Sequence, residues 1–171
     1  MKPIVLDIQN ILNTRYVMSL ESEQIITNLN AVKKISHKDI YIEVMKSLNQ
    51  KVKIWGEKTL LEWTNIPLFL TYLPNGKVIQ IIRDPRAVTA SYKHMTIEPN
   101  NRFLDAAFCC LSSLSYGKKY QHILGKDQYL LIKYEDLMDH PVEVVKNICN
   151  FLEIKFSPKL LNPENHIDMF G

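Results

Sequence analysis

The sequence predicts an α/β fold with a parallel sheet, and three features of the chain lead to that prediction. Residues 78–82 and 129–132 are short apolar runs, the first rich in β-branched side chains, and both are typical of buried strands. A segment of helical length, from about 103 to 122, separates them. Strands that alternate with helices pair in parallel through crossover connections, and helices cover both faces of the sheet. We therefore expect one α/β domain over residues 1–171.

The N-terminal third has the periodicity of helices. Apolar residues recur at helical spacing in residues 25–32 and again in residues 40–48. Ser36 and Asp39 have the capping character of a helix start. Two amphipathic helices with a break near His37 are the prediction.

The central region combines strand and helix patterns. Residues 52–55 form a short apolar run that ends at Gly56, and we interpret it as a further buried strand. Residues 60–73 have helical length, but Pro67 must kink or divide a helix there. Residues 4–8 are the first plausible strand of the chain.

Composition excludes several classes of function. The 171 residues, 46% of them hydrophobic, suffice for one core. The net charge of +3 is spread as mixed signs along the chain, which argues against a nucleic-acid partner. The three cysteines form no Cys-x-x-Cys pair and no cluster with histidines, so we expect neither a structural metal nor a disulfide framework.

Hydropathy gives the expected location. No run reaches the length of a membrane-spanning helix, and Asp7 interrupts the first apolar stretch too early for a signal peptide. As written, the chain is expected to be soluble and cytoplasmic, without a membrane segment.

The most informative stretch lies where the strand at residues 78–82 ends. Arg83 follows the strand, Asp84 is a natural helix N-cap and Pro85 a natural first helical residue. Ser91 lies close to two helical turns after Asp84, on the face that starts beside Arg83. A guanidinium and a hydroxyl placed in this way can converge on one phosphate. Spacing alone leaves open the alternative that Arg83 pairs with Asp84 or a neighbouring carboxylate and Ser91 is an ordinary packed residue.

Residues 77–92 resemble the 3′-phosphate-binding motif of the sulfotransferase family, and the Arg-Asp-Pro-Arg-Ala-Val core is especially similar to its carbohydrate-type and bacterial branches. In that family the arginine and a serine eight positions later bind the 3′-phosphate of the donor 3′-phosphoadenosine 5′-phosphosulfate (PAPS). The resemblance therefore implies this role for Arg83 and Ser91.

Two further segments resemble the same family. Residues 129–137 are similar to its later strand and Tyr-Glu-Asp-Leu turn, which implies that Tyr134 lies near the adenine. A packed tyrosine is the alternative, and Glu135 and Asp136 are interpreted as turn and cap residues. The segment Trp55-Gly56-Glu57-Lys58-Thr59 is similar to the family's Gly-(Glu or Asp)-Lys-(Thr or Ser)-Pro segment, with Leu60 in place of the proline. Lys58 would then offset charge that develops during transfer, and the alternative is a solvated lysine at a helix start.

The chain departs from the family pattern outside residues 50–157. Relatives hold the 5′-phosphate with a loop rich in Gly, Ser, Thr and Lys after the first strand, but residues 9–14 contain no glycine or lysine. Leu60 stands where cytosolic members carry the catalytic histidine, so the base is unknown, and Glu57 or Glu62 replaces it only by conjecture. We expect an incomplete P-loop-like sulfotransferase fold, either from a fragment whose loop lies upstream, which we favour, or from a divergent inactive member.

The resemblance implies transfer of a sulfonate group from PAPS, without a metal, to a hydroxyl acceptor, for which a carbohydrate is favoured over a small phenol or steroid. The alternative is an inactive nucleotide-binding relic that keeps the 3′-phosphate pocket. A P-loop kinase relative is disfavoured because the chain has no Gly-x-x-x-x-Gly-Lys-(Ser or Thr) segment.

Overall fold

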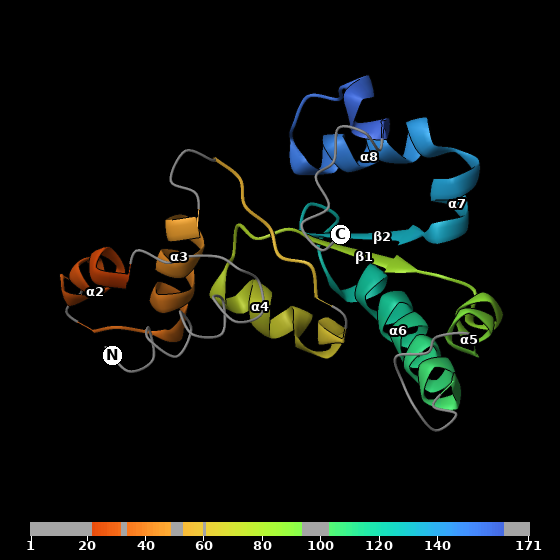
Figure 1. The fold of residues 1–171 in the computed structure, drawn as a ribbon, viewed down its shortest axis with the longest axis horizontal. Coiled ribbons are helices and arrows are strands. Elements are labelled where there is room, and N and C mark those ends of the chain that lie inside the picture. Colours follow the sequence, from red (N-terminus) through yellow and green to blue (C-terminus); the bar gives the residue numbers. More distant parts are fainter. Residues whose placement is uncertain (1–21, 32–33, 49–52, 60, 94–102, 163–171) are drawn as a thin grey trace. The chain divides into compact units, whose positions relative to one another are not determined.

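A computed structural model describes the chain over five ranges, namely residues 22–31, 34–48, 53–59, 61–93 and 103–162. The chain divides into two compact units, residues 1–59 and 60–171 (Figure 1). None of the described helices combines the length and the apolar character needed to span a membrane. The strand predicted at residues 4–8 lies outside the described residues.

The first unit is built on two helices, α2 (Ser22–Asn30) and α3 (His37–Leu48). Their apolar faces meet in a small core in which Ile25, Leu29 and Val44 are buried. The helix α3 begins where the sequence predicts, because Ser36 and Asp39 form a capping box. The Ser36 hydroxyl accepts from the Asp39 N–H at 3.3 Å, and the Asp39 carboxylate accepts from the Ser36 N–H at 2.8 Å.

The predicted strand at residues 52–55 is wrong for its described part. Residues 53–59 have no regular secondary structure, and side chains rather than a strand ladder attach this segment to α3. Trp55 packs edge-on against the ring of Tyr41, with centroids 5.5 Å apart, and the Tyr41 hydroxyl donates to Glu57 at 2.9 Å. An apolar run becomes a strand only where a neighbouring strand satisfies its backbone groups.

The second unit contains a sheet of two parallel strands, β1 (Val78–Ile82) and β2 (Tyr129–Lys133). The register pairs Val78 with Tyr129 and ends by pairing Ile82 with Lys133. Helices α5 (Pro85–Lys93) and α6 (Phe103–Ile123) form the crossover between the strands. The predicted α/β class and parallel pairing are confirmed.

Helices lie on both faces of this sheet. Figure 1 shows α6 on one side and, on the other, α8 (Pro141–Leu152), which follows the short helix α7 (Tyr134–Asp139). Gly117 lets α6 approach the sheet closely, because a Cβ there would lie only 3.0 Å from a methyl group of Leu131. The core on the α6 side is centred on buried Tyr120 and Tyr129.

The segment before β1 is divided near its proline, as predicted. A 3₁₀ turn, η1 (Glu62–Asn65), precedes α4 (Ile66–Tyr72), and Pro67 lies in the first turn of α4, where its missing N–H leaves no backbone bond unmade. Ile66 and Leu70 of α4 are buried against the Tyr120 and Tyr129 core.

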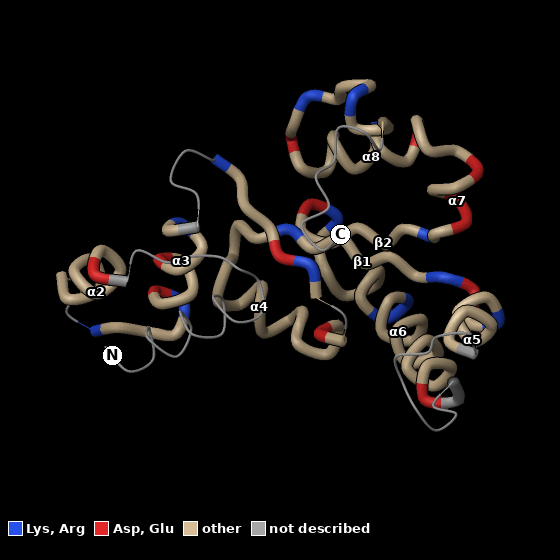
Figure 2. Tube along the Cα trace, in the orientation of Figure 1, with Lys and Arg blue, Asp and Glu red and all other residues tan. Residues whose placement is uncertain are grey.

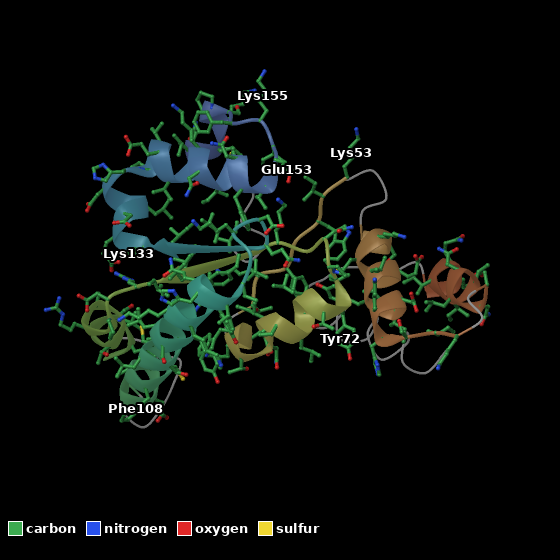
Figure 3. The ribbon with its side chains drawn as sticks, turned by 180° about the vertical axis from the view of Figure 1, so that it is seen from behind. Lys53, Tyr72, Phe108, Lys133, Glu153 and Lys155 are labelled. Carbon is green, nitrogen blue, oxygen red and sulfur yellow. The ribbon has the colours of Figure 1, made fainter. Side chains whose placement is uncertain are left out.

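The start of β1 is joined to the end of α8. Lys77 Nζ donates to the carbonyl of Phe151 at 2.7 Å and to the carboxylate of Glu153 at 2.8 Å. Glu153, labelled in Figure 3 where the chain leaves α8, has the left-handed conformation (φ 58°, ψ 35°) of a helix C-terminus. The chain then reaches a final 3₁₀ turn, η2 (Pro158–Leu161).

Candidate functional site

The pairing of the two strands continues as side-chain contacts after the ladder ends. Beyond the last pair, Ile82 with Lys133, the guanidinium carbon of Arg83 lies 4.5 Å from the ring centroid of Tyr134. The contact is a cation–π interaction, and both side chains are half-buried. Parallel strands end at the same edge of a sheet, and this carboxyl edge is where α/β proteins bind ligands.

The next step of the register is a hydrogen bond between the two chain segments. The backbone N–H of Asp84 donates to the Glu135 carboxylate at 2.9 Å. Figure 2 shows basic and acidic residues close to one another where the chain leaves β1 and where α7 begins. The pKa of Glu135 is lowered, first by this hydrogen bond and further by the charge of Arg83.

Asp84 pairs with Arg86 rather than with Arg83. Arg86 Nε donates to both carboxylate oxygens of Asp84 at 3.1 Å, and a terminal guanidinium nitrogen of Arg86 donates to the same group. These bonds, with a backbone N–H of Arg86, lower the pKa of Asp84 to about 2. None of the ion pairs among the described residues involves Arg83. The alternative that Arg83 forms an ion pair with Asp84 is therefore wrong.

Asp84 also begins α5, as the sequence predicts. Its carboxylate accepts from the backbone N–H of Arg86 at 2.8 Å, and its carbonyl accepts from the N–H of Val88 at 3.1 Å. The N-terminus of α5 thus follows directly after Arg83. A helix N-terminus and a guanidinium both favour a bound anion.

The remaining predicted site residues, Ser91 and Lys58, are both exposed. Ser91 is exposed on α5, and no hydrogen bond joins it to Arg83, so their convergence on one phosphate stays a prediction. Lys58 is exposed in the irregular segment of the first unit, while Arg83, Ser91 and Tyr134 belong to the second. The structure therefore brings together Arg83 and Tyr134.

A network of hydrogen bonds joins the two strands to α6. The Tyr129 hydroxyl donates to Gln80 Oε1 at 2.6 Å, and Gln80 Nε2 donates to the hydroxyl and carbonyl of Ser113 on α6 at 2.9 and 3.0 Å. Burial raises the pKa of the Tyr129 hydroxyl. These hydrogen bonds hold β1, β2 and α6 together, and the candidate site residues follow directly after the two strands. In the sequence, this network is indicated by Gln80, the single polar residue within the apolar run of β1.

Sequence reasoning missed two other contacts at this edge. Glu135 was interpreted as a turn residue, yet it lies in a helix and binds the backbone of Asp84. The thiol of Cys110, on α6, donates to the Arg83 carbonyl at 3.5 Å. Arg83 and Tyr134 have the same sequence separation as Asp84 and Glu135, and the ladder pairs share it. This shared separation is the signal for the contact between Asp84 and Glu135.

The charges at this edge suit an anionic ligand. Within the described ranges, no group of three or more His, Cys, Asp or Glu side chains lies close enough together to hold a metal ion. Arg83 is positively charged, and its guanidinium can donate two parallel hydrogen bonds to one phosphate. The arrangement can hold and orient a phosphate group.

Two solved structures with a similar fold are sulfotransferase domains. The chain is similar to the sulfotransferase domain from the Curacin biosynthetic pathway, with a TM-score of 0.62 at 21% identity, over 98% of this chain and 59% of that one. It is also similar to the sulfotransferase domain from the Synechococcus PCC 7002 olefin synthase, with a TM-score of 0.63 at 26% identity, over 94% and 58%.

Curated relatives agree with this similarity. The chain is 27% identical over 136 residues to sulfotransferase 2A2 of Rattus norvegicus (71% of this chain, 48% of the relative). It is 26% identical over 99 residues to the protein-tyrosine sulfotransferase of Drosophila melanogaster (56% and 20%), and 30% identical over 102 residues to the flavonol 3-sulfotransferase of Flaveria bidentis (50% and 32%). The chain spans about half the length of these relatives or less.

The family model described as "Sulfotransferase family" matches residues 10–158, well over half of the chain. This match extends the similarity beyond residues 50–157, where the motifs are clearest. Together with the α/β fold, it shows that the chain belongs to the sulfotransferase family.

Proposed function

We propose that the chain acts in the transfer of a sulfonate group from PAPS to a hydroxyl acceptor, and that Arg83 binds the 3′-phosphate of the donor. The observation that carries the proposal is the environment of the Arg83 guanidinium. It lies at the carboxyl edge of the sheet, stacks on Tyr134, and has no carboxylate partner among the described residues. Membership of the sulfotransferase family supports PAPS as the donor.

The stacking supports phosphate binding for a physical reason. A guanidinium that lies over an aromatic ring loses freedom to rotate, so its planar donors are oriented before the ligand arrives. The edge of the guanidinium is then available to two phosphate oxygens. Ser91 is proposed as the hydroxyl that completes the site, and Tyr134 as the residue that contacts the adenine through its hydroxyl or the ring face opposite Arg83.

The proposed reaction forms one bond and breaks one. The acceptor hydroxyl oxygen bonds to the donor sulfur, and the bond between sulfur and the bridging phosphate oxygen breaks. The products are a sulfate ester and adenosine 3′,5′-bisphosphate, and the hydroxyl proton goes to a base that we do not assign to a residue. Lys58 is proposed to stabilise the charge that develops on the bridging oxygen or the sulfonate.

The acceptor is proposed as a hydroxyl compound, with a carbohydrate favoured by the Arg-Asp-Pro-Arg-Ala-Val core. The names of two relatives refer to a flavonol and to protein tyrosine, and both of these carry hydroxyl groups. A panel of carbohydrate, phenol and steroid acceptors with radiolabelled PAPS separates these classes.

Calorimetric binding of adenosine 3′,5′-bisphosphate tests the donor site. We expect Arg83→Ala to weaken binding by about 2 kcal/mol, as for a charged hydrogen bond, and to leave adenosine 5′-phosphate almost unaffected because it lacks the 3′ group. Lys126→Ala is the charge-matched control, since this exposed lysine lies in the turn before β2, at the opposite end of that strand. Equal binding by wild type and Arg83→Ala would overturn the proposal.

A transfer assay with the same protein separates catalysis from binding. If the chain binds the bisphosphate but transfers no sulfonate to any acceptor, a nucleotide-binding relic is the better description. Transfer that Arg83→Ala slows and Lys126→Ala does not would support the proposed enzyme.

A further inference from the structure

The peptide group that joins Arg83 to Asp84 is held from two sides by other elements. Its N–H donates to the Glu135 carboxylate of α7 at 2.9 Å. Its carbonyl accepts from the Cys110 thiol of α6 at 3.5 Å. Both polar groups of one peptide unit are therefore bound by side chains from distant parts of the sequence.

We propose that Glu135, assisted by Cys110, is a positioning residue that fixes this peptide plane and thereby holds Arg83 and α5, which carries Ser91, in the relative orientation that binds the donor's 3′-phosphate. The inference rests on the proposed function of Arg83. Glu135 acts through the backbone, because its carboxylate accepts from the N–H of Asp84.

The position of this peptide explains why its orientation matters. It links the end of β1 to the start of α5, so rotation of the peptide plane changes the ψ angle of Arg83 and the φ angle of Asp84 together. The Cα and Cβ of Arg83 precede both rotating bonds, so either change moves α5, which carries Ser91, relative to the Arg83 side chain. A small rotation would separate the two groups that are proposed to meet on one phosphate, and misplacement by about 1 Å is enough to reduce function strongly.

The fold delivers Glu135 to this peptide through the strand register. The ladder ends by pairing Ile82 with Lys133, and two residues after the end of each strand the same sequence offset places Asp84 beside Glu135. The hydrogen bond from the Asp84 N–H and, to a smaller extent, the charge of Arg83 lower the pKa of Glu135, so the carboxylate remains an ionised acceptor at neutral pH.

A purely electrostatic role for Glu135 makes a different prediction. A carboxylate near Arg83 repels an incoming phosphate, so any neutral substitution would then strengthen binding. A positioning role instead depends on the acceptor atom. Glu135→Gln keeps an oxygen acceptor without the charge, whereas Glu135→Ala removes both. Asp136→Ala is the matched control, because Asp136 lies next on the same short helix and its side chain makes no hydrogen bond within the described part of the chain.

The first measurement needs no nucleotide. Amide hydrogen exchange followed by NMR reports on the Asp84 N–H directly. We expect Glu135→Ala to speed exchange at Asp84 by about tenfold, while Glu135→Gln and Asp136→Ala leave it within about threefold of wild type. Cys110→Ala, compared with Cys110→Ser, tests the second contact by the same signal. An unchanged exchange rate at Asp84 in Glu135→Ala would overturn the positioning role of Glu135, whether or not the nucleotide binds.

The second measurement is binding of adenosine 3′,5′-bisphosphate beside adenosine 5′-phosphate. We expect Glu135→Ala to weaken the bisphosphate about fivefold to tenfold with little effect on the monophosphate, and Glu135→Gln to bind as wild type or more tightly. Tighter binding by both neutral variants would refute positioning while leaving the proposed site intact. If wild type binds neither nucleotide, the proposed function fails, and the exchange data still decide whether Glu135 fixes the peptide between Arg83 and Asp84.

Discussion

The guanidinium of Arg83 rests on the ring of Tyr134, at 4.5 Å from its centroid, one register step beyond the last ladder pair of the sheet. The contact joins the ends of two strands that are about fifty residues apart in sequence. Because the register of β1 and β2 sets this neighbour, the sheet itself determines how the proposed phosphate-binding arginine is oriented.

Substitutions of Tyr134 measure what the ring contributes. Tyr134→Leu should weaken binding of adenosine 3′,5′-bisphosphate by about 1 kcal/mol, because Arg83 loses its stacking surface. Tyr134→Phe keeps the ring and should bind within about twofold of wild type by calorimetry. Equal losses in both variants would instead assign the effect to the hydroxyl group.

The sequence predicts the two strands of the second unit and the start of α5 because their signals are local. Residues 78–82 and 129–132 are apolar runs bounded by turns, and the structure has strands there. Asp84 and Pro85 have the side chains that helix starts require, and α5 begins at Pro85. The elements could therefore be predicted without knowledge of their neighbours.

Contacts between elements could not be predicted in this way. Two arginines flank Asp84 at short distance, and nothing local decides that Arg86 forms the ion pair while Arg83 stacks on Tyr134. The choice depends on the register, which brings Tyr134 beside Arg83. The apolar run at residues 52–55 shows the same limit, since a strand needs a partner that local pattern does not reveal.

The ion pair between Asp84 and Arg86 predicts a pH dependence. The folded-state pKa of Asp84 is lowered from 3.8 to about 2, so its contribution to stability is present above pH 3.8 and is lost as the pH falls toward 2. Asp84→Asn keeps the helix cap without the charge. We expect wild type to exceed this variant in urea unfolding midpoint above pH 4, with the difference shrinking in acid. The carbon-13 shift of the Asp84 carboxyl group gives the pKa directly, and titration near the ordinary value would contradict the ion pair.

The buried hydrogen bond between Tyr129 and Gln80 predicts coupled effects on stability. Tyr129→Phe leaves a buried amide oxygen without its donor, which should cost about 1 to 3 kcal/mol in urea unfolding. Gln80→Leu should cost a similar amount, and the double variant less than the sum of the two.

Tyr116→Phe is the matched control for that cycle. Tyr116 packs against Tyr120 in the same core, and its hydroxyl makes no hydrogen bond among the described residues, so its loss should change stability by less than about 0.5 kcal/mol. Strict additivity of the Tyr129 and Gln80 substitutions would show that the two groups do not interact in solution.

The left-handed residue Glu153 predicts an unusual order of stability between two small substitutions. A residue with a Cβ pays about 1 to 2 kcal/mol in this conformation, and glycine does not. Glycine loses more backbone entropy on folding, by about 0.4 to 1 kcal/mol, which offsets part of the gain. Both Glu153→Gly and Glu153→Ala remove the exposed carboxylate that accepts from Lys77, so that loss cancels between them. We expect Glu153→Gly to be more stable than Glu153→Ala by about 0.5 to 1 kcal/mol in urea unfolding. The opposite order would mean that Glu153 is not left-handed in solution. The hydrogen bonds from Lys77 to Phe151 and Glu153 at the end of α8 would then differ from those described.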